Sequence, residues 1–337
     1  MAYTIIWMDG FDENGSTGDK YTVGGETSGG SISTDGAFSY GRSCLLPSGA
    51  YISKGLGSNY TVVFLHAHIK IAASSTGDKQ LFVFRDEANN VSQFEVQVGY
   101  DGVSAYKLKL YRGSTLVATS TAGIPVGIWT ALSIRYVCNS STGECSAQIN
   151  GASAVSFTGN TQNGGAAQVN RVLINNATGV NVGIDNWVLA TGLSTDAILP
   201  ECRIYGAVVP TGNSSVQFTP NAGSNWSNVN EIPANEDASY NYMASPGYKD
   251  VFTCSPPALT GAILAVKVNF RARKDDANSI QCAAVIQPGS TPYTSPAMPL
   301  YTTYFEQGAI WQTNPATSAA WTPSDLASLK FGYASAN

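Results

Sequence analysis

Two histidines, His66 and His68, are the only imidazoles in the chain, and they stand two residues apart in an apolar segment. Alternation along a strand turns both side chains to the same face of a sheet. Two nitrogens on one face could begin a metal site, but no Cys, Asp or Glu stands nearby in the sequence to complete a tetrahedral set. A Ser or Cys nucleophile would need one of them as its base, and the Gly-x-Ser-x-Gly turn is missing. We expect packing or a polar contact for both.

Paired carboxylates are the second kind of residue that could do chemistry, since a glycosidase needs two of them flanking a cleft. The Glu-x-Asp-x-x-Glu strand signature of jelly-roll glucanases is absent. Adjacent acids occur only beside expected turns, where Asp is favoured, and we expect them to be solvated. These pairs are Asp12 with Glu13, Asp86 with Glu87, Glu236 with Asp237, and Asp275 with Asp276. No catalytic residue is assigned, and the sequence favours a protein that is not an enzyme.

Three further carboxylates, Asp9, Asp12 and Asp185, would approach one another if the first and last strands of one domain were neighbours. Hard oxygen ligands of this kind suit calcium. Turn and backbone hydrogen bonds are the use we favour for them. We therefore assign no metal ligand and no cofactor.

The sequence gives little support for binding of phosphate groups, nucleic acid or membranes. The glycines at positions 24, 25, 29 and 30 lie among Ser and Thr, but no Lys follows at phosphate-binding spacing, so we expect a mobile loop. The net charge of −5 leaves no basic surface for nucleic acid or for an acidic membrane. The longest apolar stretch, Tyr60–Ala73, is interrupted by His66, His68 and Lys70 and falls short of the roughly 20 residues that span a bilayer.

Six cysteines occur, and the N-terminal MAYTIIWMDGFDENG lacks the basic region and apolar run of a secretory signal. We therefore expect a chain made in the cytosol with mostly reduced, buried thiols. Cys138 and Cys145 flank the turn NSSTGE and could face each other across a hairpin, so their redox state stays open.

The elements that must position these residues are strands. Gly, Ser, Thr and Asn are abundant, charged residues make up only 12% of the chain, and apolar residues alternate with polar ones. Many short strands between turns indicate sandwiches. The clearest strands expected in the first domain are Tyr60–Ala72, Gln80–Arg85, Ser92–Tyr100, Ala105–Arg112, Trp129–Asn139, Cys145–Asn150, Arg171–Asn175 and Val182–Ala190.

The alternation lapses between Ala190 and Pro200, and a new strand is expected at Cys202–Val209. We therefore predict an all-β protein with a jelly-roll sandwich over residues 1–198 and a second, smaller β-sandwich over residues 199–337. One helical turn is expected after Thr322, which can cap it, with Pro323 in its first position. Aromatic residues gather in the second domain, and we expect most of them to pack in the core or under loops. They are Trp226, Tyr240, Tyr242, Tyr248, Tyr293, Tyr301, Tyr304, Phe305 and Trp311.

Two groups of segments, one in each expected domain, carry a resemblance to known families. The opening WMDGFD, with Trp7, Asp9, Phe11 and Asp12, and the strand IDNWVLATG, with Ile184, Asp185, Asn186 and Trp187, resemble the first and last strands of concanavalin-A-like (laminin-G-like) jelly rolls of phage proteins. RIYGAVVPTGNSSVQFTP, ILAVKVNFRARKDD and AAWTPSDLASLKFGY resemble the C-terminal domain of tailed-bacteriophage virion proteins. The residues that carry this second match are Arg203, Tyr205, Pro210, Arg271, Arg273, Lys274, Asp275, Asp276 and Trp321.

The resemblance implies a place on the phage particle, on capsid or tail, after synthesis in the host cytoplasm. We expect a non-enzymatic structural protein of the virion, touching other virion proteins and forming a symmetric oligomer, with a trimer preferred. The alternative is a glycan-binding adhesin for host recognition, whose jelly roll binds a host-surface glycan through exposed aromatic residues and loop carboxylates. Neither nucleic acid nor a membrane is an expected partner. A polysaccharide depolymerase is disfavoured by the missing acid pair.

Overall fold

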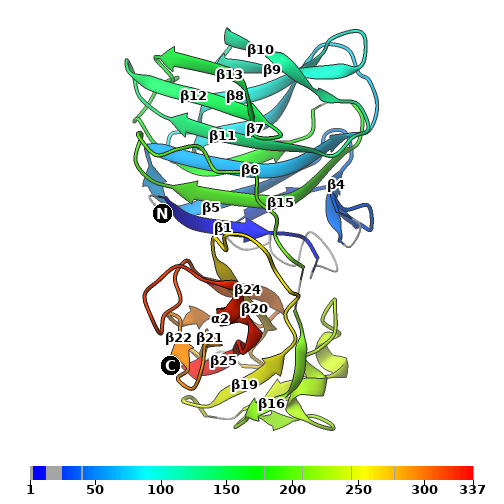
Figure 1. Cartoon of the computed structure of the whole chain (residues 1–337), viewed down its shortest axis with the longest axis vertical. Coiled ribbons are helices and arrows are strands. Elements are labelled where there is room, and N and C mark those ends of the chain that lie inside the picture. Colours follow the sequence, from blue (N-terminus) through cyan, green and yellow to red (C-terminus); the bar gives the residue numbers. More distant parts are fainter. Residues whose placement is uncertain are drawn as a thin grey trace. The chain divides into compact units, whose positions relative to one another are not determined.

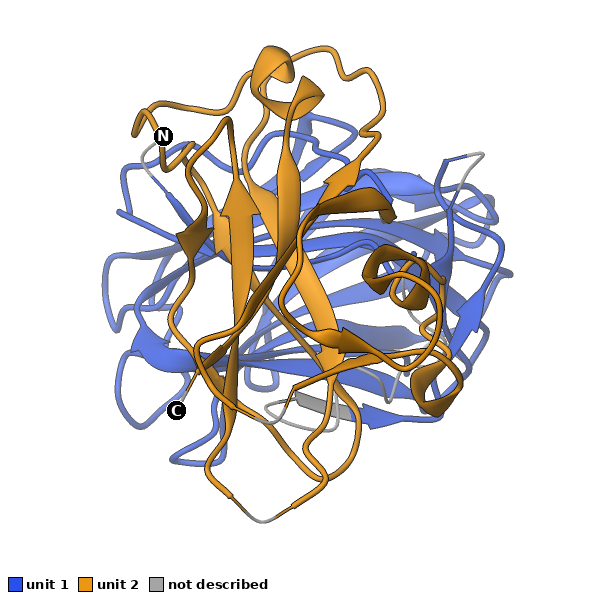
Figure 2. Cartoon of the chain, turned by 90° about the horizontal axis from the view of Figure 1, so that it is seen from below, with its two compact units in different colours: residues 1–12, 16–206 blue, residues 13–15, 207–337 orange. Residues whose placement is uncertain are grey.

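The computed structural model describes residues 3–12, 25–38, 41–177, 179–206, 208–243, 245–276 and 278–336. Nearly all of the regular structure is β-strand, and all strand pairs are antiparallel (Figure 1). The described residues fall into two compact units (Figure 2), the first ending at Gly206 and the second beginning at Val208. Both are sandwiches of antiparallel sheets, the first a jelly roll and the second a smaller sandwich.

Unit 1 consists of two facing sheets. The first, which we call sheet A, has the strand order β13 (Ala152–Gly159), β12 (Gly143–Ile149), β11 (Thr130–Val137), β6 (Val62–Ile71), β15 (Val182–Thr191), β4 (Ser43–Leu46), β3 (Ser31–Ser33), with β1 (Thr4–Asp9) also paired to β15. The second, sheet B, has the order β10 (Thr115–Pro125), β9 (Ala105–Arg112), β8 (Val91–Tyr100), β7 (Asp78–Asp86), β14 (Val169–Asn175), β5 (Tyr51–Tyr60), β2 (Gly25–Ser28).

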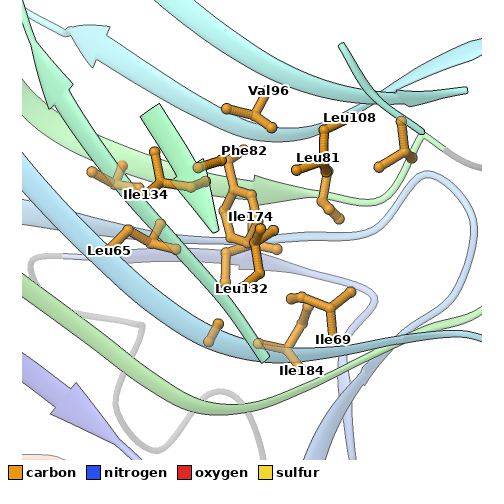
Figure 3. Close-up of a cluster of buried hydrophobic side chains, with 14 of the residues drawn as sticks. Leu65, Ile69, Leu81, Phe82, Val96, Leu108, Leu132, Ile134, Ile174 and Ile184 are labelled. Carbon is orange, nitrogen blue, oxygen red and sulfur yellow. The ribbon is translucent and has the colours of Figure 1, made fainter. Parts of the chain in front are cut away.

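The core of unit 1 lies between the two sheets and follows the period of two that the sequence shows. Leu65 and Ile69 of β6 point inward from sheet A, and Val96 of β8 and Leu108 of β9 point inward from sheet B (Figure 3). All four side chains are fully buried. The alternate residues of β6 point to the other face of sheet A, which therefore has to be covered or solvated.

Strand β15 changes its partner along its length. Its first residues pair with β4, Ile184 opposite Cys44, and its later residues pair with β1, Trp187 opposite Asp9. The register to β6 also shifts between Asp185 and Val188, and Asn186 has a positive φ of 51°. A bulge of this kind re-aims side chains, so Asp185 and Asn186 stand out from the regular ladder.

Unit 2 is built around one sheet with the order β16 (Pro210–Ser215), β19 (Lys249–Cys254), β25 (Lys330–Ala336), β21 (Gln281–Gln287), β22 (Tyr293–Thr294), with β23 (Met298–Pro299) paired to β21. Two small sheets pair β17 (Thr219–Pro220) with β18 (Asn241–Tyr242) and β20 (Val266–Ala272) with β24 (Phe305–Trp311). Short helices η1 (Asn225–Asn228) and η2 (Glu236–Ala238) lie in the loops between β17 and β18.

The predicted helical turn is present as α2 (Pro323–Ala327). The Thr322 side chain accepts a hydrogen bond from the Asp325 N–H, and Pro323 occupies the first turn, as the capping pattern requires. Trp321, at 3% exposure, lies beside it in the core and donates from its indole to the Trp311 carbonyl at 2.8 Å. No helix among the described residues is long and apolar enough to cross a membrane.

The segment after β15 differs from the prediction. A strand was expected at Cys202–Val209, but the first strand after β15 in the described part of the chain is β16, which begins at Pro210. Leu199 is fully buried, and the segment to Gly206 belongs to unit 1. Backbone N–H groups of this segment bind side chains of sheet A instead of a neighbouring strand. The division between the units thus lies eight residues beyond the expected one at 198.

Candidate functional site

The polar residues of interest gather on the face of sheet A that is turned away from the core, which we call the outer face. His66 and His68 of β6 both lie there, as the alternation predicts, because their neighbours Leu65, Ala67 and Ile69 point inward. In the register, His66 lies opposite Ser133 of β11, and His68 lies opposite Asp185 of β15. The outer face therefore brings together residues from three strands.

His66 is fully buried and bonded on both nitrogens. Its Nδ1 lies 2.9 Å from the Ser133 hydroxyl, and its Nε2 lies 3.4 Å from the Cys202 backbone nitrogen. A backbone N–H can only donate, so Nε2 accepts and the ring proton of neutral His66 sits on Nδ1. That proton is donated to Ser133, so the imidazole cannot take the serine proton in this arrangement. Burial, with a smaller effect of His68, lowers the pKa of His66 to about 3.

His68 is only 5% exposed. Its Nε2 lies 3.9 Å from the Glu201 carboxylate, and its buried Nδ1 has no hydrogen-bond partner among the described residues. The ring meets His66 and Phe38 edge to face, with centroids 5.1 Å and 5.0 Å away. Burial and then the charge of Arg203 lower the pKa of His68 to about 4, so the ring is neutral at pH 7.

Arg203 lies close to two aromatic rings. Its guanidinium carbon lies 4.1 Å from the Phe38 ring centroid and 4.6 Å from that of Tyr205. These are distances for cation–π stacking. Tyr205 is 46% exposed, so the stack borders solvent. Arg203 and Tyr205 come from the segment that follows β15, and Phe38 comes from the segment before β4.

A second group of aromatic and charged residues lies on the same outer face, at the other end of the 35–38 segment. The Lys70 ammonium is 2.8 Å from the Asp35 carboxylate, which also accepts from the Trp129 indole at 3.3 Å. The hydrogen bond from Lys70 is the main cause that lowers the pKa of Asp35. Trp129 lies against Gly183, where a Cβ would come within 2.7 Å of the ring. A larger residue at position 183 would therefore displace the indole.

We call the two groups together the outer-face strip, which consists of Trp129, Lys70, Asp35, Phe38, Arg203 and Tyr205. They belong to unit 1 and come from four separate parts of the chain. Lys70 lies on β6, and Trp129 lies just before β11. Asp35 and Phe38 lie between β3 and β4, and Arg203 and Tyr205 lie in the 199–206 segment. The Ile204 N–H donates to the Asn186 side chain at 2.6 Å, which fixes that segment to the bulge of β15.

The three carboxylates considered for calcium do come near one another, because β1 pairs with β15. Each accepts backbone hydrogen bonds: Asp9 from the Phe11 N–H and Asp12 from the Arg42 N–H, both at 2.8 Å, and Asp185 from Ala37 and Asn186. Burial, and to a lesser extent the charges of Asp12 and Asp9, raise the pKa of Asp185 to about 7. Within the described residues, no three His, Cys, Asp or Glu side chains are arranged to hold a metal ion.

Some of the adjacent acids are less solvated than predicted. Asp86 is fully buried, because its carboxylate accepts from the Asn89 and Gln168 side chains and so closes the turn after β7. Glu236 and Asp237 form ion pairs with Arg271 and Arg273 of the β20 region. Asp275 and Asp276 lie in an exposed turn, as predicted, and Glu87 and Asp237 are exposed as well. Glu13 and Gly24 lie outside the described residues.

Cys138 and Cys145 are both buried and both free. The register places Cys145 opposite Tyr136, so the two cysteines are not directly opposed across the hairpin. The remaining cysteines are free as well. Among the aromatic residues of unit 2, Phe305 is buried, whereas Tyr240, Tyr242 and Tyr248 are 38%, 50% and 42% exposed. Packing therefore accounts for some of that group but not for these three tyrosines.

The sequence analysis missed Arg203 as a site residue, although it noted the residue in the resemblance. The spacing Arg-x-Tyr in an extended segment was the only available signal, and it does not reveal that Phe38 completes the stack. Trp129, Lys70 and Asp35 were missed for the same reason, since they meet only through the fold.

Comparison with known proteins gives no family and no curated relative. No family model matches the chain, and no curated protein matches it. Solved structures do match. An endo-β-1,4-glucuronan lyase from the fungus Trichoderma reesei is 12% identical with a TM-score of 0.42, and the match covers 56% of this chain and 96% of that one. A carbohydrate esterase from the Shiga toxin-encoding bacteriophage phi24B is 14% identical with a TM-score of 0.40, covering 57% and 100%.

An endo-1,3-β-glucanase from Streptomyces sioyaensis is 11% identical with a TM-score of 0.40, and the match covers 57% of this chain and 98% of that one. This comparison corrects the predicted main function, a non-enzymatic structural protein of a virion, and the prediction that the chain is no enzyme: the three proteins named here are a lyase, an esterase and a glucanase. At these identities the likeness itself shows the sandwich fold alone.

Proposed function

We propose that this protein is a glycan-binding adhesin for host recognition, carried on a bacteriophage particle, and that the outer-face strip is its glycan-binding surface. The observation that carries the proposal is the strip itself. Trp129 and Tyr205 lie on one sheet face, each beside charged side chains. Aromatic rings offer apolar faces to the C–H groups of a sugar, and neighbouring polar groups fix its hydroxyls.

The fixed geometry of the strip favours binding. Trp129 is held by its bond to Asp35 and by Gly183 beneath it, and Tyr205 is held by the Arg203 stack. Side chains that are already ordered lose little conformational entropy when a ligand arrives. The resemblance of Trp7, Asp9, Asp185 and Trp187 to phage jelly rolls supports the proposed place on a virion.

The test is a glycan array probed with the whole chain, followed by titration of any glycan that binds. Tyr205→Ala should weaken binding at least about ten-fold, as expected for an aromatic anchor. Tyr248→Ala is the matched control, since that tyrosine is similarly exposed but belongs to unit 2. Trp129→Ala should also weaken binding, with melting temperature as the check on folding. Absence of saturable binding, or equal binding by Tyr205→Ala and the parent, would overturn the proposal.

A further inference from the structure

The guanidinium of Arg203 lies against two aromatic rings, those of Phe38 and Tyr205. No hydrogen bond or ion pair joins Arg203 to any residue that the structure describes. Its nitrogens are not among the buried polar atoms that lack partners, so they reach solvent. A guanidinium carries five N–H donors in a fixed planar fork. Arg203 therefore presents several of these donors outward.

Five other arginines of the described chain form ion pairs, whereas Arg112, like Arg203, forms none. A carboxylate lies within ion-pair distance of each of these five, which are Arg85, Arg135, Arg171, Arg271 and Arg273. Glu201 is close to Arg203 in the sequence, but its carboxylate lies near His68, and it forms no ion pair with Arg203 in the described structure. Among the described residues, Arg203 thus has no carboxylate within ion-pair distance.

We infer that Arg203 binds a carboxylate of the ligand, so that the glycan recognised by the outer-face strip is an acidic one, built of uronic or similar carboxylate-bearing sugars. This inference rests on the proposed function. Arg binds carboxylates through two parallel N–H···O bonds, which need the guanidinium plane to be fixed. The contacts with Phe38 and Tyr205 restrict the movement of the guanidinium before a ligand binds. Neutral His68 adds no competing charge beside it.

The position of Tyr205 beside Arg203 favours a ligand in which the carboxylate is part of a sugar. Tyr205 is half exposed and lies against Arg203. Its ring therefore borders the place where the carboxylate of the ligand would lie. A sugar bound against Tyr205 would set its carboxylate beside the guanidinium edge. The Lys70–Asp35 pair farther along the strip is already neutralised, so Arg203 is the cation available to the ligand.

The experiment uses an array on which each acidic glycan stands beside its carboxyl-reduced form, in which the uronate has become a neutral hexose. The whole chain should bind the acidic form about 10- to 100-fold more tightly, as expected for charge-assisted hydrogen bonds. Arg203→Gln should bind both forms about equally, and Arg203→Lys should keep only part of the preference. Arg112→Gln is the control, because Arg112 lies on β9 and bonds only a backbone carbonyl at 3.4 Å.

Each outcome separates the two proposals. Equal binding of acidic and reduced forms by the parent protein, or binding of neutral glycans only, overturns the role of Arg203 and leaves the adhesin proposal standing. A preference that survives in Arg203→Gln with an unchanged melting temperature also overturns it. If no glycan binds in either form, the proposed function itself is wrong. The comparison of the two forms by the parent protein needs no variant, so a misfolded variant cannot obscure the result.

Discussion

Replacing Asp185 by asparagine is expected to change how the stability of unit 1 depends on pH. Asp185 is 4% exposed, and its pKa is raised from 3.8 to about 7, chiefly by burial. The folded state therefore prefers the protonated acid, whereas the unfolded chain ionises it above about pH 4. As pH rises from about 4 to about 7, the unfolded state loses its proton first, and the folded state loses stability. Above about pH 7 the full cost of the buried charge is present.

The magnitude follows from the pKa values. The rise from 3.8 to about 7 corresponds to about 4 kcal/mol at about 1.4 kcal/mol per pKa unit. An asparagine side chain at this position cannot ionise, so the variant escapes this cost. It loses one good acceptor for the Ala37 or Asn186 N–H, at roughly 1 to 2 kcal/mol, at every pH. The variant should be slightly less stable than the parent at about pH 4.5 and more stable at about pH 8.

Urea unfolding of the full chain, followed by circular dichroism at about pH 4.5, 6 and 8, measures this difference. The transition that moves in the variant belongs to unit 1. Titrating groups far from Asp185 are present in both proteins, so their effects cancel when the two are subtracted. Asp250→Asn is a useful control, since Asp250 is also buried but lies in unit 2. A stability difference that stays constant over this pH range would refute the reasoning.

Three further predictions follow from the same region and from the cysteines. A chain ending at residue 206 should keep the cover over His66 and His68, whereas one ending at residue 198 should melt at a lower temperature; equal melting temperatures would show that the 199–206 segment is not part of the unit 1 fold. The pKa of His68 is lowered from 6.5 to about 4, so unit 1 should lose stability as pH falls through that range. The variant His68→Gln should lose less. If the melting temperatures of the variant and the parent depend on pH in the same way, the burial of a neutral imidazole is contradicted. Cys138 and Cys145 are free thiols in the core, so the parent should melt at the same temperature with and without a reductant, and the double variant Cys138→Ser, Cys145→Ser should still fold; a reductant-dependent melting temperature would reveal a bridge.

Local patterns in the sequence determined the strands. Alternation of apolar and polar residues identified the class of the protein and placed His66 and His68 on one face of β6, because a strand's side-chain directions depend only on the chain's own period. Thr322 and Pro323 identified α2 for the same reason, since a helix cap is a contact between residues a few positions apart. Residues that are close together in the sequence are enough to predict both the side-chain directions of β6 and the cap of α2.

The tertiary structure decided the end of unit 1 and the composition of the outer-face strip. The segment 199–206 was expected to open the second domain, but it belongs to unit 1, where Asn186 and His66 accept its backbone N–H groups. Asn186 reaches it because β15 changes partner at that point. Phe38 meets Arg203 only because the segments before β4 and after β15 lie on the same sheet face. Such contacts join residues far apart in the chain, and no local period records which of them will meet.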